Sequence, residues 1–364
     1  MKKVLFATTA LIATAGMAAA EVKISGYGRF GLDWNEANEG APVTQPGDSG
    51  DDAAETNLTS RFRLTFDAST ETDGGVTVGG RIRAQAENRD GAQGAATWSS
   101  PQFHVAYGGL RVNVGNIWGA IDSAPGLYLN TTSVGTGIDG MGFNSLAIKG
   151  AKFDTFTSAG VGRGGVEAIY SAGGFTGHIS YSKQNDTVAV AADTDASDGT
   201  ISPAVDAAQG EERIAVMLNY SFGDYFVTGA YQASDNGATG VTLGGQTVEL
   251  NDGIAFLAFG ADFGQFGATL QLAETEAADA ITLAGEAEIG AASTLIAWVS
   301  NADSNQVDTN TAAAGIQDGV NDGTAFGINY EYDLGGGVTF VAGYVNTAAD
   351  DNDNSVQAGL HFSF

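Results

Sequence analysis

The 364-residue sequence has no cysteine, only five prolines and three histidines, and only 15 basic residues beside 43 acidic ones. Without cysteine there are no disulfide bonds and no thiolate ligands or nucleophiles. The formal net charge of −28 argues against nucleic acid and anionic lipid surfaces as partners and favours divalent cations. Beyond residue 20, no apolar run reaches the 18 residues that a membrane-spanning helix needs.

The first twenty residues form a segment of their own. Lys2 and Lys3 precede an uncharged apolar run from Val4 to Met17, and Ala18-Ala19-Ala20 follow before the first acidic residue, Glu21. A basic start, an apolar middle and a small-residue end are the parts of a secretory signal peptide. We therefore predict that residues 1–20 are a cleaved signal and that residues 21–364 form a single domain.

The rest of the chain alternates between apolar and polar residues in many short segments, which Gly, Asn and Asp separate. Hydrophobic types make up 43% of the sequence and glycine contributes 53 residues, a composition that does not fit disorder. The alternation predicts an all-β protein rather than an α/β one. We expect sixteen strands, an even number as in bacterial outer-membrane barrels. They are 21–34, 57–68, 75–87, 101–107, 110–118, 165–171, 175–184, 211–222, 225–234, 252–263, 266–274, 279–289, 293–301, 323–332, 338–347 and 355–364.

Short and long connections alternate between these strands. The short ones carry tight hairpin signals, at 108–109, 173–174, 223–224, 264–265 and 333–337. The long ones are polar, acidic and rich in glycine, at 35–56, 88–100, 119–164, 185–210, 302–322 and 348–354. This asymmetry is typical of an outer-membrane barrel with short periplasmic turns and long extracellular loops, whereas a soluble sandwich has no reason to segregate them.

The two faces of the expected strands differ in character. In the final strand, Val356, Leu360 and Phe364 share one face, and its ten residues match the length of a tilted membrane strand. A soluble sandwich would alternate in the same way, but aromatic residues at the expected rims favour a membrane barrel. These are Trp34, Tyr107, Tyr170, Tyr181, Tyr220, Phe222, Tyr225 and Phe263. We predict a 16-stranded antiparallel transmembrane β-barrel, closed by pairing of the first and last strands.

Five arginines fall on the polar faces of three consecutive strands: Arg29, Arg61, Arg63, Arg81 and Arg83. Adjacent strands lie about 4.8 Å apart, so these side chains would form one basic patch on the inner wall. The plainer interpretation is that each arginine simply solvates a polar lumen. The connection 119–164 is too long for an ordinary hairpin and carries Asp122, Asp139 and Asp154. If it folds inward, its carboxylates would oppose the arginines across a narrowed passage.

Motifs that suggest chemistry lack the context that the chemistry needs. Residues 26–31 match G-x-G-x-x-G, but strand alternation runs through them where a dinucleotide site needs a helix. His104, His178 and His361 lie on different strands without acidic residues at metal-site spacing, and no G-x-S-x-G turn occurs. We predict no enzymatic activity and no assigned metal. The acidic runs 48–55, 274–279 and 350–353 could still hold structural Ca²⁺ or bridge through divalent cations to lipopolysaccharide.

Four segments resemble the general diffusion porins of the alphaproteobacterial, Rhodobacter type. They are Glu21-Val22-Lys23-Ile24-Ser25-Gly26 with Arg29 following, Ser60-Arg61-Phe62-Arg63, Tyr170-Ser171-Ala172-Gly173, and Leu334-Gly335-Gly336-Gly337. The resemblance covers essentially the whole chain. It implies a homotrimer in the Gram-negative outer membrane, with each pore narrowed by the third long loop. It also implies that the barrel assembly machinery recognises the final strand with Phe362 and Phe364.

The expected function is passive diffusion of small hydrophilic solutes and ions through a water-filled lumen. The net charge predicts a weak preference for cations. Two alternatives stay open. A substrate-specific porin would need an aromatic track, for which Tyr27 and Phe226 are the only obvious candidates. An outer-membrane adhesion or structural barrel would have a blocked lumen.

Overall fold

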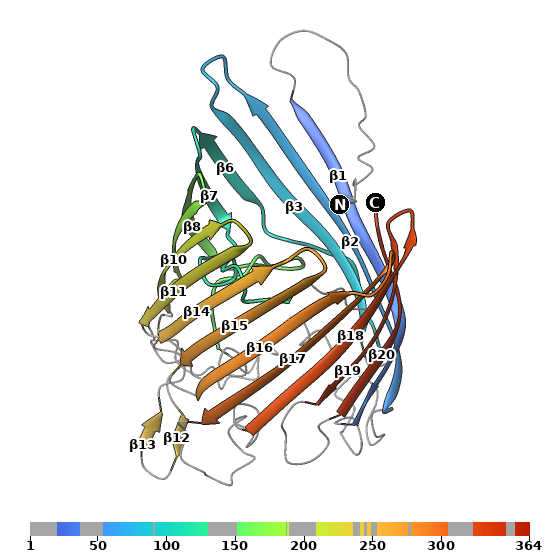
Figure 1. Ribbon diagram of the computed structural model, residues 1–364. Helices are drawn as coiled ribbons and strands as arrows, with labels where there is room; N and C mark the ends of the chain where they lie inside the picture. The colour runs from blue at the N-terminus through green and yellow to red at the C-terminus, as the bar shows by residue number, and fades with distance from the viewer. Residues whose placement is uncertain are drawn as a thin grey trace, which may run out of the picture.

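The protein is a closed antiparallel β-barrel in the computed structural model (Figure 1), which describes residues 20–36, 54–89, 92–129, 151–186, 188, 209–235, 241–243, 246–248, 253–275, 278–304, 323–346 and 354–364. Within these ranges sixteen strands form the barrel. They are β1 (Glu21–Asn35), β2 (Thr56–Glu71), β3 (Thr77–Arg89), β6 (Gln102–Tyr107), β7 (Leu110–Asn116), β8 (Gly164–Ala172), β9 (Phe175–Lys183), β10 (Glu212–Phe222), β11 (Tyr225–Asp235), β14 (Gly253–Asp262), β15 (Phe266–Thr275), β16 (Ala278–Glu288), β17 (Ser293–Ser304), β18 (Gly323–Gly335), β19 (Val338–Asn346) and β20 (Asn354–Ser363).

Four short pieces accompany the barrel strands. β4 (Ala92–Gln93) and β5 (Thr97–Trp98) both pair with β3. β12 (Val241–Leu243) and β13 (Gln246–Val248) form a separate hairpin at the end of the barrel opposite the β2–β3 turn (Figure 1). No helix in the described ranges is long and apolar enough to cross a membrane.

The first and last strands close the barrel. β1 pairs antiparallel with β2 on one side and with β20 on the other, where Phe30 lies opposite Leu360. The amide of Gly26 donates to the carbonyl oxygen of Phe364 at 2.9 Å, and the Phe364 amide donates back at 3.0 Å. Closure leaves no unpaired edge in the sheet, as a membrane interior requires. All sixteen strands predicted from the sequence, and the pairing of the first with the last, are confirmed.

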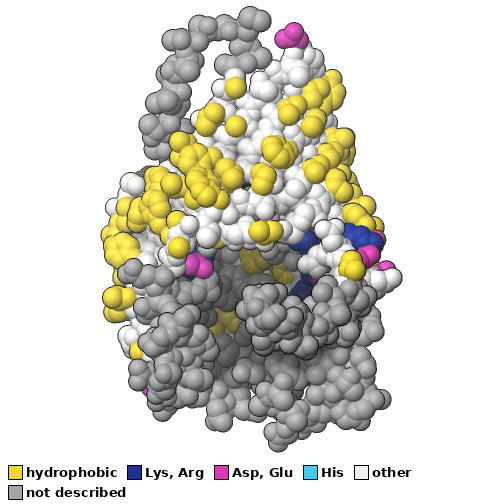
Figure 2. Space-filling model, turned by 180° about the vertical axis from the view of Figure 1, so that it is seen from behind, with side chains coloured by type: hydrophobic (Ala, Val, Ile, Leu, Met, Phe, Trp, Pro, Cys, Tyr) yellow, Lys and Arg dark blue, Asp and Glu magenta, His cyan; other side chains and the backbone are white. Residues whose placement is uncertain are grey.

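The apolar faces of the strands point outward. Val22 and Leu32 are 61% and 53% exposed, whereas Arg29 and Asp33 on the other face of β1 are 6% and 3% exposed. Figure 2 shows hydrophobic side chains spread over the described outer surface, with few charged ones among them. This distribution is the reverse of that in a soluble sandwich, so it removes the ambiguity that the alternation alone left open.

Short hairpins join the strands at one rim, which lies at the top of Figure 1 for β2–β3 and β18–β19. Gly108, Gly173 and Gly223 adopt φ values of +57°, +60° and +59° in their turns, a region open to glycine at little cost. Aromatic rings line the same rim. Tyr220, Phe222, Tyr225 and Phe263 follow one another with ring centroids 5.7 to 5.9 Å apart, as in a membrane-interface girdle.

Candidate functional site

The long connection between β7 and β8 enters the lumen, as predicted. Its first limb (residues 117–129) and its second limb (residues 151–163) both reach strands far from where they begin. The Gln271 side-chain amide on β15 donates to the carbonyl oxygen of Gly126 in the first limb. The Gln232 amide on β11 donates to the carbonyl oxygen of Lys152 in the second limb at 2.8 Å. The two limbs therefore cross the barrel interior and narrow it.

Small inner-wall side chains make room for the first limb. Ala120, Ile121 and Leu127 are almost completely buried in one cluster with residues of β10 to β19. The wall's share of this cluster consists largely of alanines, at positions 215, 230, 258, 273, 278, 280, 284, 302 and 325. Burying an isoleucine or leucine side chain contributes about 1.5–3 kcal/mol, so these contacts hold the limb firmly. Because methyl groups occupy the wall, the limb fits inside without overpacking.

Glu167 on β8 fixes the start of the first limb. Its carboxylate accepts hydrogen bonds from the Asn113 side chain at 2.7 Å and from the Gly119 amide at 2.9 Å. His178 Nε2 lies 3.0 Å from the same carboxylate. Glu167 is 1% exposed, so the loss of any of these partners would leave a buried polar group unpaired and would destabilise the network. Glu167 was not among the residues predicted for the site, although its place on the polar face of a strand beside a long loop was a usable signal.

Asp154 anchors the second limb to the wall rather than standing in open lumen. Its Oδ1 lies 3.2 Å from Nη1 of Arg213 on β10 and 3.6 Å from Nε of Arg163. Ser182 donates to the same oxygen at 2.9 Å. Glu211 completes the network with Arg163 at 2.8 Å and Arg213 at 2.7 Å. Two carboxylates and two guanidinium groups thus form one buried ionic cluster at the end of the loop.

The predicted arginines lie together on the inner wall of β1, β2 and β3. Arg29 is directly opposite Arg61 in the β1–β2 register, and Arg63 is opposite Gln85 in the β2–β3 register. Wall carboxylates pair with Arg61 and Arg81. Arg61 Nε lies 2.5 Å from Glu87, and Arg81 Nε lies 2.6 Å from Asp67. The patch is therefore less positive than five free charges. The tight turn between β2 and β3 sets this register, so the two ion pairs were detectable in the sequence.

Arg83 contacts the described limbs of the loop directly. Its guanidinium carbon lies 4.9 Å from the ring centroid of Trp118 and 4.6 Å from that of Phe156. Its Nη1 donates to the hydroxyl of Ser158 at 3.1 Å. The arginine wall and the inward loop are therefore in direct contact at this point.

Asp122 is the described loop carboxylate that best fits the predicted role of a negative charge opposite the arginines. Tyr128 donates a 2.6 Å hydrogen bond to it. Burial raises the pKa of Asp122 to about 6, against the opposing effects of the Tyr128 hydrogen bond and, more weakly, the charge of Arg83. Asp122 is thus within electrostatic range of the basic wall. Asp139 lies outside the described residues.

Further acidic residues line the inner wall on strands away from the arginines, and one of them, Asp262, lies halfway round the barrel from β2. Asp262, Glu286 and Glu331 fall on the inner faces of β14, β16 and β18. β14 is eight strands from β2 in the ring. A cavity of about 460 Å³ lies between the loop, at Gly126 and Leu129, and this part of the wall. These three carboxylates were not predicted as part of the site, although the alternation of their strands placed them on polar faces.

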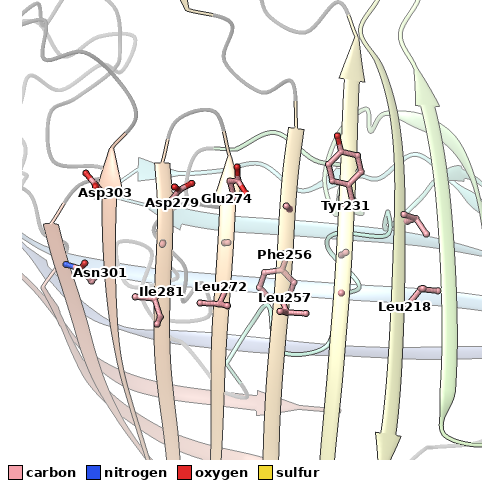
Figure 3. Close-up of a pocket in the computed structure, with 16 residues that line it drawn as sticks. Leu218, Tyr231, Phe256, Leu257, Leu272, Glu274, Asp279, Ile281, Asn301 and Asp303 are labelled. Atoms are coloured by element: carbon pink, nitrogen blue, oxygen red, sulfur yellow. The ribbon is translucent and has the colours of Figure 1, made fainter.

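A second, larger cavity of about 790 Å³ lies on the outer face of β10 to β17 and not in the lumen (Figure 3). Exposed Leu218, Leu272 and Ile281 form its apolar floor, and Glu274 and Asp279 stand side by side at its edge. Because these side chains point away from the barrel interior, the cavity faces the membrane. It is not part of the conducting path.

Comparison with known proteins agrees with this geometry. A family model described as Gram-negative porin matches residues 7–355. A porin of Fuscovulum blasticum is 27% identical over 349 residues, covering 94% of this chain and 100% of the relative. A porin of Rhodobacter capsulatus is 26% identical with the same coverage of both chains. Solved structures of Rh. blastica porin mutants have a TM-score of 0.65 at 24% identity, covering 94% and 100%, which supports the fold. With its closed sixteen-stranded barrel and inward loop, the chain belongs to the Gram-negative porin family and forms an outer-membrane channel.

Proposed function

We propose that the channel is a general diffusion pore with a weak preference for cations, narrowed by the two limbs of the loop. The loop's crossing of the lumen next to the arginine wall carries this proposal. A solute that passes there meets Arg29, Arg61, Arg63, Arg81 and Arg83 on one side and the loop on the other. Size would be sieved by the loop, and ion preference would follow the balance of charge around it.

The charge balance supports a preference for cations. Glu87 and Asp67 partly neutralise the arginine wall through Arg61 and Arg81. Asp122 adds a carboxylate from the loop, and Asp262 and Glu286 add two from the opposite wall. Asp154, in contrast, shares its charge with Arg163 and Arg213, so we assign it to holding the loop more than to attracting ions.

The pore performs no chemistry in this proposal. The described part of the chain has no group of three or more His, Cys, Asp or Glu residues arranged to hold a metal ion. Of the acidic runs proposed for Ca²⁺, residues 48–53 and 350–353 lie outside the described residues. Structural calcium in those loops therefore stays a proposal from the sequence.

We propose three kinds of partner. Two further copies of the chain would complete a homotrimer, as the family resemblance implies. Outer-membrane lipid and lipopolysaccharide would surround the apolar outer face, and the carboxylates beside the outer cavity of Figure 3 suit contacts through divalent cations. The barrel assembly machinery would recognise the strand ending in Phe362 and Phe364.

The structure favours a diffusion pore over a substrate-specific one. Tyr27 is flanked by the Arg63 guanidinium at 5.0 Å and by the His361 ring at 5.1 Å. Phe226 packs against Gly260 and lies beside Gly126 of the loop. The two candidates for an aromatic track are therefore engaged by the protein itself. Permeation rates of sugars of graded size should fall smoothly without saturation, whereas a saturating sugar would favour a specific porin.

Ion selectivity in planar bilayers tests the charge assignment. Replacing Arg61 and Arg63 by Gln should raise the cation-to-anion permeability ratio at least about threefold, because a single unit charge about 6 Å from an ion in water already changes that ion's energy by about 0.7 kcal/mol. The reversal potential in a salt gradient measures this ratio. An unchanged potential would remove the basic wall from the proposal, and a barrel without stepwise conductance would favour the adhesion alternative.

A further inference from the structure

We propose that Arg83 is a positioning residue that ties both limbs of the constriction loop to the barrel wall. The inference goes beyond a share in the positive wall. It shares one assumption with the proposed function, namely that this loop forms the constriction of the pore.

The two rings that contact Arg83 come from different limbs. Trp118 belongs to the first limb and Phe156 to the second, and their ring centroids are 5.1 Å apart. The guanidinium carbon lies within 5 Å of both centroids. The hydrogen bond from Nη1 to Ser158 adds a second contact with the second limb. One side chain therefore joins two segments that are almost forty residues apart in sequence.

The backbone around Arg83 is itself held to the second limb. The Ser99 amide donates to the Arg83 carbonyl oxygen at 2.7 Å, and the Arg83 amide donates to the Ser99 hydroxyl at 2.9 Å. From the same segment, the Trp98 carbonyl oxygen accepts the Gly160 amide at 2.9 Å. The guanidinium therefore extends from a fixed point, which a positioning contact needs.

In the contacts that the structure describes, Arg61, Arg63 and Arg81 bind the wall. Arg61 and Arg81 pair with Glu87 and Asp67, and Arg63 donates to Gln85 at 2.7 Å. Arg81 lies two residues from Arg83 on the same face of β3 and carries the same charge. It therefore serves as a matched control, because a general effect of charge would act on both positions.

The contact depends on the shape of arginine as well as on its charge. A planar guanidinium stacks on aromatic rings, whereas a lysine ammonium is a compact and strongly hydrated charge. Arg83→Lys keeps the charge of the wall but loses the planar contact with both rings. Losing a desolvated cation–π contact should increase the population of the released loop about 30-fold.

Fluorescence of Trp118 reports the position of the loop independently of conduction. In a background where Trp34, Trp98 and Trp298 are replaced by Phe, Trp118 is the sole emitter. We expect Arg83→Lys to red-shift its emission and to increase acrylamide quenching, while Arg81→Lys leaves both unchanged. In single-channel records, Arg83→Lys should add closing events and open-channel noise that Arg81→Lys lacks.

A second variant acts from the loop side and leaves the wall intact. Phe156→Leu removes one ring from the contact, so it should reproduce the fluorescence and noise of Arg83→Lys. The double variant should be no worse than Arg83→Lys alone, because Arg83→Lys already breaks the interaction that Phe156→Leu weakens. Equal Trp118 emission in the Arg83→Lys and Arg81→Lys variants, or additive effects in the double variant, would overturn the inference. The emission of Trp118 could shift as expected in Arg83→Lys while ion selectivity stays unchanged in the variant of Arg61 and Arg63. That result would leave this inference standing and would remove only the charge assignment of the proposed function.

Discussion

The Asp154 carboxylate lies 3.2 Å from Nη1 of Arg213, so the second limb of the loop is held to β10 by a buried ion pair. Arg163 shares the same oxygen. Removing one member of a buried ionic cluster leaves the others without compensation.

Asp154→Asn should therefore lower the stability of the folded barrel. We expect a loss of about 3–5 kcal/mol, the usual effect of breaking a buried pair. Denaturant unfolding in detergent, followed by tryptophan fluorescence, measures it. Asp303→Asn, on the exposed outer end of β17, is the control and should change stability little. Similar losses in the two variants would show that the ionic cluster does not hold the loop.

Asp122 should make the pore respond to pH. Its pKa is raised, mainly by burial, to about 6 from a usual 3.8. Its negative charge is therefore lost as pH falls through about 6, and cation preference should fall with it. A pKa that is raised in the folded state also makes the free energy of unfolding depend on pH. The contribution of Asp122 is fully present below pH 3.8 and is lost as pH rises through about 6.

Reversal potentials between pH 8 and pH 4 would reveal the midpoint. Asp122→Asn should abolish the step near pH 6 and leave the titration of other carboxylates at lower pH. A step that persists in the Asn variant belongs to another group.

Gly126 should set how closely the tip of the first limb approaches the wall. It has φ of +86°, and an added Cβ would lie 2.8 Å from the Cβ of Ala258. Gly160 has φ of +81° with open space around its Cβ position. Alanine at either position meets the same backbone strain, about 1–2 kcal/mol. Only Gly126→Ala also pushes the tip away from β14 into the lumen.

Single-channel conductance separates the two variants. We expect a lower conductance for Gly126→Ala and a normal one for Gly160→Ala, with similar losses of stability in both. Equal conductance would mean that the tip does not limit the flow of ions.

Deleting Phe364 should reduce assembly more than conduction. The Phe364 ring lies 5.6 Å from that of Phe62 on β2, and its backbone exchanges two hydrogen bonds with Gly26. The yield of folded barrel in the outer membrane should fall, while the channels that do form should conduct normally. Phe263→Ala, a loss of one exposed aromatic at the same rim, is the control. A normal yield after the deletion would contradict a role in assembly.

The barrel was predictable because its pattern is local. Alternation such as that of Val22 and Leu32 against Arg29 and Asp33 recurs in most strands, and short glycine turns mark the ends. The adjacency of Arg29 and Arg61 follows from that pattern, because neighbouring strands share one register. The inward loop was inferred from its length and from the family resemblance.

The partners of the loop were not predictable in the same way. Asp154 meets Arg213 across 59 positions of sequence, and no local spacing signals such a pair. Trp118 and Phe156 approach Arg83 only because the loop turns back on itself inside the barrel. A pattern of polar and apolar residues predicts which side chains face the lumen, but it does not predict which of them bind one another there.

The wall holds the first limb through methyl contacts, and it holds both limbs through the backbone carbonyl oxygens of Gly126 and Lys152. A backbone carbonyl is present whatever side chain the residue carries. The lumen-facing side chains of the loop can therefore change without loss of these attachments. Loop side chains other than Trp118, Phe156 and Asp154 can therefore change the filter without releasing the loop, and new selectivities can be selected or engineered at those positions while the barrel stays as it is.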